Sequence, residues 1–274
     1  MKTHMNTTPT TTPITPKIVF FDIDDTLYIK HENRILDSTK TALHALKKRG
    51  IMVAIATGRG LCVFPPCINE LIDEIGIDIF VTINGQYNEY QGKCLTHFPL
   101  THAQLTHTTA HLQSERIAHG YMTRNEIVTV SSDEYMVQAL TSLHIPYRVA
   151  ESFDMNTPVY QMLAFYENNH TAQLSSALRD DLKTVRWHIF GVDILDVHGS
   201  KARGIRAVLD KLGLSMAEAW AFGDGLNDIE MLSSVGFGVA MGNAHPDLKT
   251  VADYVCPRHD DDGIFKGLVD LGLI

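Results

Sequence analysis

Three acidic residues directly follow an apolar run near the start of the chain. The stretch FFDIDDTLYI places Asp22, Asp24 and Asp25 after Ile18-Val19-Phe20-Phe21. Carboxylates this close repel one another, and removing them from water at the end of a buried strand costs free energy. Asp22 and Asp24 lie two positions apart, so on extended backbone they project the same way while Asp25 points elsewhere. A metal ion, a role in a reaction or simple solvation must therefore account for carboxylates clustered at this position.

A second acidic pair lies near the other end of the chain. The segment GDGLND carries Asp224 and, one helical turn later, Asp228. Carboxylate oxygens are the ligands that Mg²⁺ prefers in proteins. If the fold brings this pair to Asp22 and Asp24, the four carboxylates can share a divalent cation.

Donors suited to an anion are found in two other segments. Thr57 offers a hydroxyl and, together with Gly58, backbone N–H groups, while Lys201 offers a positive charge in the first turn of an expected helix. A cation is electrostatically misplaced at a helix N-terminus, so Lys201 is expected to point at an anionic group. Donors of these kinds hold phosphoryl groups.

The elements that would position these residues alternate along the chain. The sequence predicts buried strands at KIVFFDI, IMVAIA and IFVTIN, separated by helices over residues 38–49 and 68–75. After a helix over residues 200–212, the same alternation returns with strands at AWAF, FGVAM and YVC. This βαβα order predicts an α/β fold with a Rossmann-like parallel-sheet core and helices on both faces. The polar residues follow the strands directly, and ligands bind at that edge of such sheets.

The middle of the chain has a different character. Residues 86–191 mix hairpin-like strands with helices, which predicts an α+β domain inserted into the core. The expected organisation is a Thr/Pro-rich disordered tail over residues 1–16, a core over residues 17–85 and 192–274, and the inserted domain between the two core segments.

Composition excludes several classes of function. The formal net charge of -9 and the lack of a basic cluster argue against a nucleic-acid partner. The sequence shows no apolar run long enough for a bilayer and no secretory signal, and its four cysteines are too sparse for a disulfide scaffold. We therefore expect a cytoplasmic protein with reduced thiols and no membrane partner.

The motifs resemble those of a known family. DIDDT at residues 22–26, ATGR at residues 56–59, SK at residues 200–201 and GDGLND at residues 223–228 are similar to the four motifs of haloacid dehalogenase-like hydrolases, in their Cof-type phosphatase branch. That branch typically carries a large α/β cap between the second and third motifs, where the insertion lies. The resemblance extends over everything after the tail, and the motifs are specific to the superfamily rather than to a substrate.

Carried over by position, the resemblance gives each acidic residue a role. Asp22 would be the nucleophile that forms an aspartyl-phosphate, and Asp24 the acid that protonates the leaving oxygen and then activates water. Mg²⁺ would be held by Asp22, by the backbone carbonyl of Asp24 and by Asp224. Asp228 would act as a further ligand, directly or through water.

The same resemblance assigns the phosphate-binding groups. Thr57, with Gly58 beside it, and Lys201 would bind the phosphoryl oxygens, and Asn227 would support that site. One departure is that Asp25 stands where the family more often has Gly, a position expected to point away from the site.

Together these features predict an enzyme. We expect a Mg²⁺-dependent phosphatase of small phosphorylated metabolites, such as sugar phosphates, that is a monomer or a homodimer. A phosphomutase of the same fold needs the same aspartates, and a non-catalytic phosphate-binding module would retain the fold, so both alternatives stay open at this point.

Overall fold

The computed structural model describes residues 14–167 and 178–274, and these divide into two compact units. The first comprises residues 14–58, 65–96 and 200–274, and the second comprises residues 59–64, 97–167 and 178–199. The expected tail therefore falls mostly outside the described residues, as does a short part of the expected insertion. None of the helices in the described part of the chain has the length and apolar character that crossing a membrane requires.

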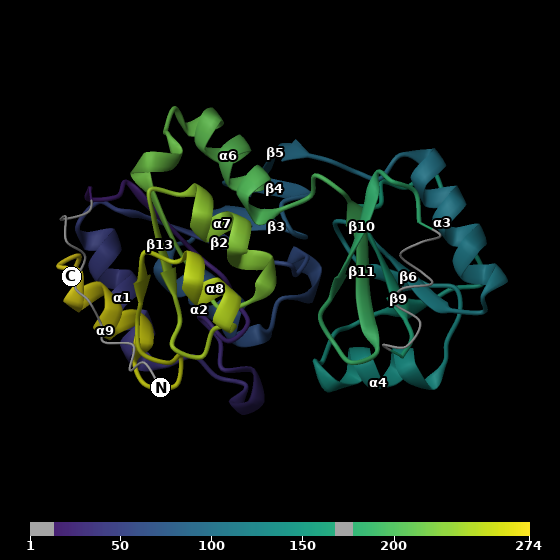
Figure 1. Cartoon of the computed structure of the whole chain (residues 1–274), viewed down its shortest axis with the longest axis horizontal. Coiled ribbons are helices and arrows are strands. Elements are labelled where there is room, and N and C mark those ends of the chain that lie inside the picture. The colour runs from purple at the N-terminus through teal and green to yellow at the C-terminus, as the bar shows by residue number, and fades with distance from the viewer. Residues whose placement is uncertain (1–13, 168–177) are drawn as a thin grey trace. The chain divides into compact units, whose positions relative to one another are not determined.

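An eight-stranded sheet forms the centre of the first unit, in the order β14-β13-β12-β1-β2-β3-β4-β5 (Figure 1). The strands from β14 to β3 pair in parallel, and β4 pairs antiparallel to β3. The strands are β1 (Ile18–Phe21), β2 (Met52–Ala56), β3 (Ile79–Thr82), β4 (Tyr87–Tyr90), β5 (Lys93–His97), β12 (Ala219–Gly223), β13 (Phe237–Ala240) and β14 (Tyr254–Val255).

Helices cover both faces of this sheet, as the uninterrupted apolar strands predict. Their bounds are α1 (Asp37–Lys48), α2 (Pro66–Ile75), α6 (Lys201–Leu212), α7 (Ile229–Ser234), α8 (Pro246–Val251) and α9 (Gly263–Asp270). Figure 1 shows α6, α7 and α8 together, and their apolar residues form one core with Ile18 and Phe20 of β1. The expected Rossmann-like α/β core is confirmed.

The second unit contains a six-stranded sheet in the order β10-β11-β9-β6-β7-β8. Its pairs are antiparallel except for β7 with β8. The elements are α3 (His102–Ser114), β6 (Ala118–Met122), β7 (Ile127–Thr129), α4 (Glu134–Ser142), β8 (Arg148–Val149), β9 (Gln161–Phe165), β10 (Leu182–Arg186) and β11 (Gly191–Asp196). This mixture of strands and helices is the α+β character that the sequence predicts for the insertion.

The boundaries of the inserted unit differ from the expected residues 86–191. The hairpin of β4 and β5 extends the core sheet beside β3, so the insertion begins at His97. At the other end, β11 pairs with β9 and β10, so the return to the core comes after Gly199. A hairpin has the same alternating pattern in either sheet, and only its pairing partner decides the unit to which it belongs.

Candidate active site

The predicted chemical groups lie at the carboxyl edge of the core sheet. Phe21, the last residue of β1, pairs with Phe222 of β12 and Ile55 of β2, so the residues that follow the three strands emerge side by side. The Asp22 N–H donates to the Phe222 carbonyl at 3.0 Å, which continues the ladder one residue beyond β1. The Thr57 N–H donates to the Val81 carbonyl at 2.8 Å and fixes the end of β2 in the same way.

Lys201 lies at the centre of this cluster and is fully buried. Its Nζ donates to Asp22 Oδ1 and to Asp228 Oδ1, both at 2.6 Å. The Ser200 side chain caps α6 by accepting the N–H of Arg203 at 3.1 Å, so Lys201 is the first helical residue. The two carboxylates supply the negative charge that a lysine in this position requires, as the sequence predicts.

Asp228 is also fully buried, and both of its oxygens have partners. Oδ1 accepts from Lys201, while Oδ2 accepts the N–H groups of Asp224 at 3.0 Å and of Gly225 at 2.9 Å. A Cβ added to Gly223 would lie 2.5 Å from Asp228 Cγ, so this approach requires glycine. Asp228 thereby ties Lys201 to the loop that carries Asp224.

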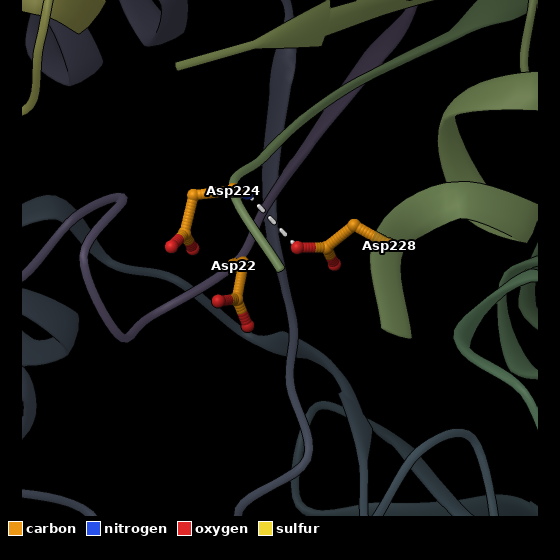
Figure 2. A group of neighbouring side chains, drawn as sticks. All are labelled: Asp22, Asp224 and Asp228. Atoms are coloured by element: carbon orange, nitrogen blue, oxygen red, sulfur yellow. Dashed lines mark hydrogen bonds between the residues drawn. The ribbon is translucent and has the colours of Figure 1, made fainter. Parts of the chain in front are cut away.

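Three carboxylates converge at this point. Ligand oxygens of Asp22, Asp224 and Asp228 all lie within 4.8 Å of one another. Figure 2 shows the three side chains together, with the hydrogen bond between Asp224 and Asp228 dashed. Thr26 adds a hydrogen bond from its hydroxyl to Asp224 Oδ1 at 3.2 Å.

Burial and like charge perturb these acids strongly. Burial raises the pKa of Asp22 to about 7. Attraction to Lys201 opposes this rise, and repulsion from Asp228 and Asp24 adds to it. Burial, followed by repulsion from Asp22 and Asp228, raises the pKa of Asp224 to about 8. Burial alone would lower the pKa of Lys201, but the two carboxylates at 2.6 Å outweigh it and raise that pKa. The cluster thus holds more negative charge than one lysine balances.

A left-handed turn presents Asn84 at the same edge. Ile83, Asn84 and Gly85 have φ values of 52°, 51° and 79°, and a β-branched residue at positive φ is strained. The turn is held by the Asn84 N–H donating to the Thr57 carbonyl at 3.1 Å, and Asn84 Oδ1 accepts from Asn227 Nδ2 at 3.2 Å.

Glycines at this edge allow close packing. A Cβ on Gly85 would lie 2.1 Å from the Ser200 carbonyl, so the turn that carries Asn84 packs tightly against the start of α6. A Cβ on Gly58 would lie 3.2 Å from Asn84 Oδ1 and 3.6 Å from Asn227 Nδ2. The two amides therefore lie beside the backbone of Gly58, the residue that follows Thr57.

Asp24 and Asp25 have separate environments. Asp24 is partly exposed, and its carboxylate is not part of the three-carboxylate group found among the described residues. Asp25 has φ 55°, a conformation that favours glycine, and its carboxylate accepts the N–H of Lys30 at 3.3 Å and lies 3.1 Å from Lys30 Nζ. The Asp at this position is therefore accommodated by a local ion pair.

The donor set fits a divalent metal ion. Asp22 and Asp224 are close, desolvated and mutually repulsive, and a hard cation relieves that repulsion with the oxygen ligands it prefers. Asp228 belongs to the same group, but its oxygens already accept three N–H donors from Lys201, Asp224 and Gly225. Its contacts suit a residue that orients the other ligands.

Sequence reasoning missed three of these connections. It placed Asp22, Asp24, Thr57, Lys201, Asp224 and Asp228 at the edge of the sheet, but it did not anticipate that Lys201 would bind Asp22 and Asp228 together. It also missed the hydrogen bond from Thr26 to Asp224. The signal for the lysine contacts was the cation in a first helical turn, which indicates an anionic partner but does not identify it.

Comparisons with known proteins give matches over nearly the whole chain. The sequence profile of the haloacid dehalogenase-like hydrolases matches residues 19–268. A Bacillus subtilis (strain 168) protein named "Putative phosphatase YkrA" is 33% identical over 260 residues, which cover 94% of this chain and 98% of that protein.

Two solved structures share the fold over nearly the whole chain. A hypothetical protein of Geobacillus kaustophilus HTA426 is 38% identical, with a TM-score of 0.85 over 94% of this chain and 100% of that one. The sugar phosphatase BT4131, described as a subclass IIB member of the superfamily, is 30% identical, with a TM-score of 0.86 and the same coverage.

Proposed function

The chain belongs to the haloacid dehalogenase-like hydrolases and is a phosphatase of that family, and on this premise we propose that it hydrolyses small phosphorylated metabolites with Mg²⁺ through an aspartyl-phosphate on Asp22. The observation that carries the proposal is the buried lysine between two carboxylates. Lys201 Nζ lies 2.6 Å from Asp22 and 2.6 Å from Asp228, within a group of three acids at the carboxyl edge of the sheet.

The lysine suits Asp22 to nucleophilic attack. Burial favours the protonated acid, but the charge of Lys201 acts in the opposite direction and favours the carboxylate that attack requires. One oxygen of Asp22 forms the bond to phosphorus as the bond from phosphorus to the leaving oxygen breaks. Asp24, which is partly exposed, gives its proton to that leaving oxygen.

The second half of the reaction reverses the role of Asp24. As a carboxylate it takes a proton from water, whose oxygen attacks the phosphorus of the aspartyl-phosphate. The bond from phosphorus to Asp22 breaks, and inorganic phosphate leaves. Thr57 and Gly58, with Asn84 and Asn227 beside them, supply donors for the phosphoryl oxygens.

The metal would be held by Asp22, by the backbone carbonyl of Asp24 and by Asp224, with Asp228 orienting the loop of Asp224. Mg²⁺ supplies positive charge to the transferring phosphoryl group and relieves the repulsion among the acids. The excess of carboxylates over lysine supports this assignment.

The relatives and the size of the insertion support the proposed substrate class. A structural relative that is 30% identical is titled a sugar phosphatase. We propose that the unit from His97 to Gly199 is a cap that recognises the part of the substrate that is not phosphate. Binding energy from such a remote part can raise turnover of the correct substrate.

The nucleophile is tested by Asp22→Asn, which is nearly isosteric with the wild type. Purified protein is assayed for phosphate release from p-nitrophenyl phosphate and a panel of sugar phosphates, and folding is checked by circular dichroism. The variant should lose turnover by orders of magnitude while staying folded. Hydrolysis near the wild-type rate would refute Asp22 as nucleophile.

The metal is tested by chelation. EDTA should abolish phosphate release and added Mg²⁺ should restore it, because the acids at the site then regain their counter-charge. A variant of an exposed acid that is not part of the three-carboxylate group, Glu134→Gln on α4, serves as the control and should keep the wild-type Mg²⁺ dependence. Activity that is indifferent to EDTA would exclude the proposed metal site.

A further inference from the structure

The turn that carries Asp24 depends on the backbone of the residue that follows it. The N–H of Asp25 donates to the Tyr28 carbonyl at 2.8 Å, and the N–H of Tyr28 donates to the Ile23 carbonyl at 2.9 Å. Asp25 has a φ of 55°, a left-handed conformation that is unfavourable for residues other than glycine. Such a conformation persists only where surrounding contacts hold it.

One of these contacts comes from near the other end of the chain. The side-chain Nδ2 of Asn243 donates to the Asp25 carbonyl at 2.8 Å, across 218 positions of sequence. The N–H and the carbonyl of Asp25 are thus both fixed, and Lys30 holds its carboxylate. Because the Asp25 N–H belongs to the same planar peptide as the Asp24 carbonyl, these bonds also fix the backbone of Asp24.

The side-chain amide of Asn243 is itself held in one orientation. Its Oδ1 accepts the backbone N–H of His259 at 2.9 Å, which leaves Nδ2 turned towards Asp25. The preceding residue, Gly242, packs closely on the same segment, because a Cβ there would lie 2.7 Å from the backbone nitrogen of Arg258. Asn243 therefore links the turn of Asp25 to the segment that contains Arg258 and His259.

The loop that contains Asn243 also holds the second acidic segment of the site. The Met241 N–H donates to the Gly223 carbonyl at 3.0 Å, and the His245 N–H donates to the Asp224 carbonyl at 2.9 Å. Asn243 lies between these two anchors in the sequence, and all of these residues belong to the core unit. The loop thus joins the two segments that carry the acids of the site.

We propose that Asn243 is a positioning residue that aims the carboxyl group of Asp24 at the leaving oxygen of the substrate. The inference rests on the proposed function, in which Asp24 protonates that oxygen, and it adds a residue outside the four sequence motifs. Asn243 acts through the backbone of Asp25 and not on the reacting atoms. Its loss should therefore weaken proton transfer to the leaving oxygen more than attack by Asp22.

The basicity of the leaving oxygen separates proton transfer from the other steps. A sugar alkoxide is a strong base that needs a proton as its bond to phosphorus breaks, whereas p-nitrophenolate is a weak base that leaves without one. The rate of leaving-group release is measured in a single turnover, with enzyme in excess over substrate and with saturating Mg²⁺. The leaving-group ratio is the rate for p-nitrophenyl phosphate divided by the rate for the sugar phosphate that the wild type hydrolyses fastest.

Two variants of Asn243 are compared with two reference variants. Asn243→Ala removes the amide, and Asn243→Asp keeps an acceptor for the His259 N–H but has no N–H for the Asp25 carbonyl. Asp24→Asn removes the proposed proton donor and gives the full size of the effect. The matched control is Asp253→Ala, because Asp253 Oδ2 accepts a backbone N–H of β13 at 2.8 Å in the same unit, a bond of equal length that does not involve the turn of Asp25.

Asp24→Asn should raise the leaving-group ratio about a hundredfold, because general acid catalysis contributes at least that much to the departure of a basic group. Both variants of Asn243 should raise the ratio about tenfold, because a small misplacement of a catalytic group removes a large part of its effect. Asp253→Ala should keep the wild-type ratio, even where its melting temperature falls as far as that of Asn243→Ala. If Asn243→Ala does not fold, the nearly isosteric Asn243→Asp decides the question.

Three results would overturn the inference. The first is an unchanged ratio in the Asn243 variants while Asp24→Asn raises it, which would leave the proposed function intact and remove Asn243 from it. The second is an equal rise in Asp253→Ala, which would trace the effect to lost stability. The third is a wild-type ratio in Asp24→Asn, in which case the acid role of Asp24 itself fails and the inference fails with it.

Discussion

Lys201→Met should destabilise the core as well as inactivate it. Methionine fills similar space without charge, so Asp22 and Asp228 would remain buried with no cation between them. Removing one partner of a buried ion pair costs about 3–5 kcal/mol. Domains are typically stable by about 5–15 kcal/mol, so this single change should remove a large fraction of the free energy of unfolding.

The assay is urea unfolding of the metal-free protein, followed by the fluorescence of Trp220 on β12. The chain has two tryptophans, so all proteins carry Trp187→Phe to make Trp220 the only reporter. The control is Lys40→Met, because Lys40 makes an ion pair with Glu74 at 3.0 Å with both side chains partly exposed. An exposed pair contributes about 1 kcal/mol or less.

A second substitution separates stability from activity. Asp228→Asn on the Lys201→Met background removes one of the two buried charges and keeps an oxygen for the N–H groups of Asp224 and Gly225. The double variant should recover much of the lost stability while staying inactive, because Lys201 is still absent. A free energy of unfolding of Lys201→Met within about 1 kcal/mol of the wild-type value would contradict a stabilising role for these buried ion pairs.

Further predictions concern the glycine beside Asp228, a buried acid of the cap and the metal-free acids. Gly223→Ala would place a Cβ 2.5 Å from Asp228 Cγ, so thermal unfolding should show a loss of about 1–3 kcal/mol, and an unchanged melting temperature would contradict that packing. Burial raises the pKa of Asp193 well above its usual value, so the folded cap holds this proton more tightly than the unfolded chain and loses stability as the pH rises above about 4. Asp193→Asn should therefore stabilise the cap more at pH 8 than at pH 4, and an equal effect at both pH values would refute this. In EDTA, pKa values of about 7 for Asp22 and about 8 for Asp224 mean that the folded core binds more protons than the unfolded chain, so its stability should fall from about pH 4 to pH 8, and Mg²⁺ should stabilise it more at the upper end of that range. Asp224→Ala should raise the Mg²⁺ concentration needed for half-maximal activity at least tenfold, and an unchanged requirement would remove Asp224 from the metal site.

Much of the core could be predicted because its pattern is local. Each buried parallel strand is an uninterrupted apolar run, and the polar residue that ends the run marks the edge at which ligands bind. Asp22 after β1 and Asp224 after β12 were found in this way. Their adjacency follows from the parallel pairing of the two strands.

The rest depends on partners that the pattern does not specify. The hairpin of β4 and β5 alternates like any half-buried pair, and its position beside β3 is decided by tertiary contacts. Likewise, a lysine in the first turn of a helix indicates an anion, but only the fold shows that Lys201 has two, Asp22 and Asp228. The Ile83-Asn84-Gly85 turn has positive φ at two residues that are not glycine, which their identities do not predict.

The covalent intermediate is the central claim, and its direct test is the mass of the protein during turnover. Wild-type protein is mixed with Mg²⁺ and an excess of p-nitrophenyl phosphate, quenched in acid at early times and digested for mass spectrometry. We predict one added phosphoryl group on the peptide that contains Asp22, and no addition to that peptide in Asp22→Asn. Phosphate release by the wild type with no phosphoryl group on Asp22 at any time, or with the group on another residue, would contradict the account.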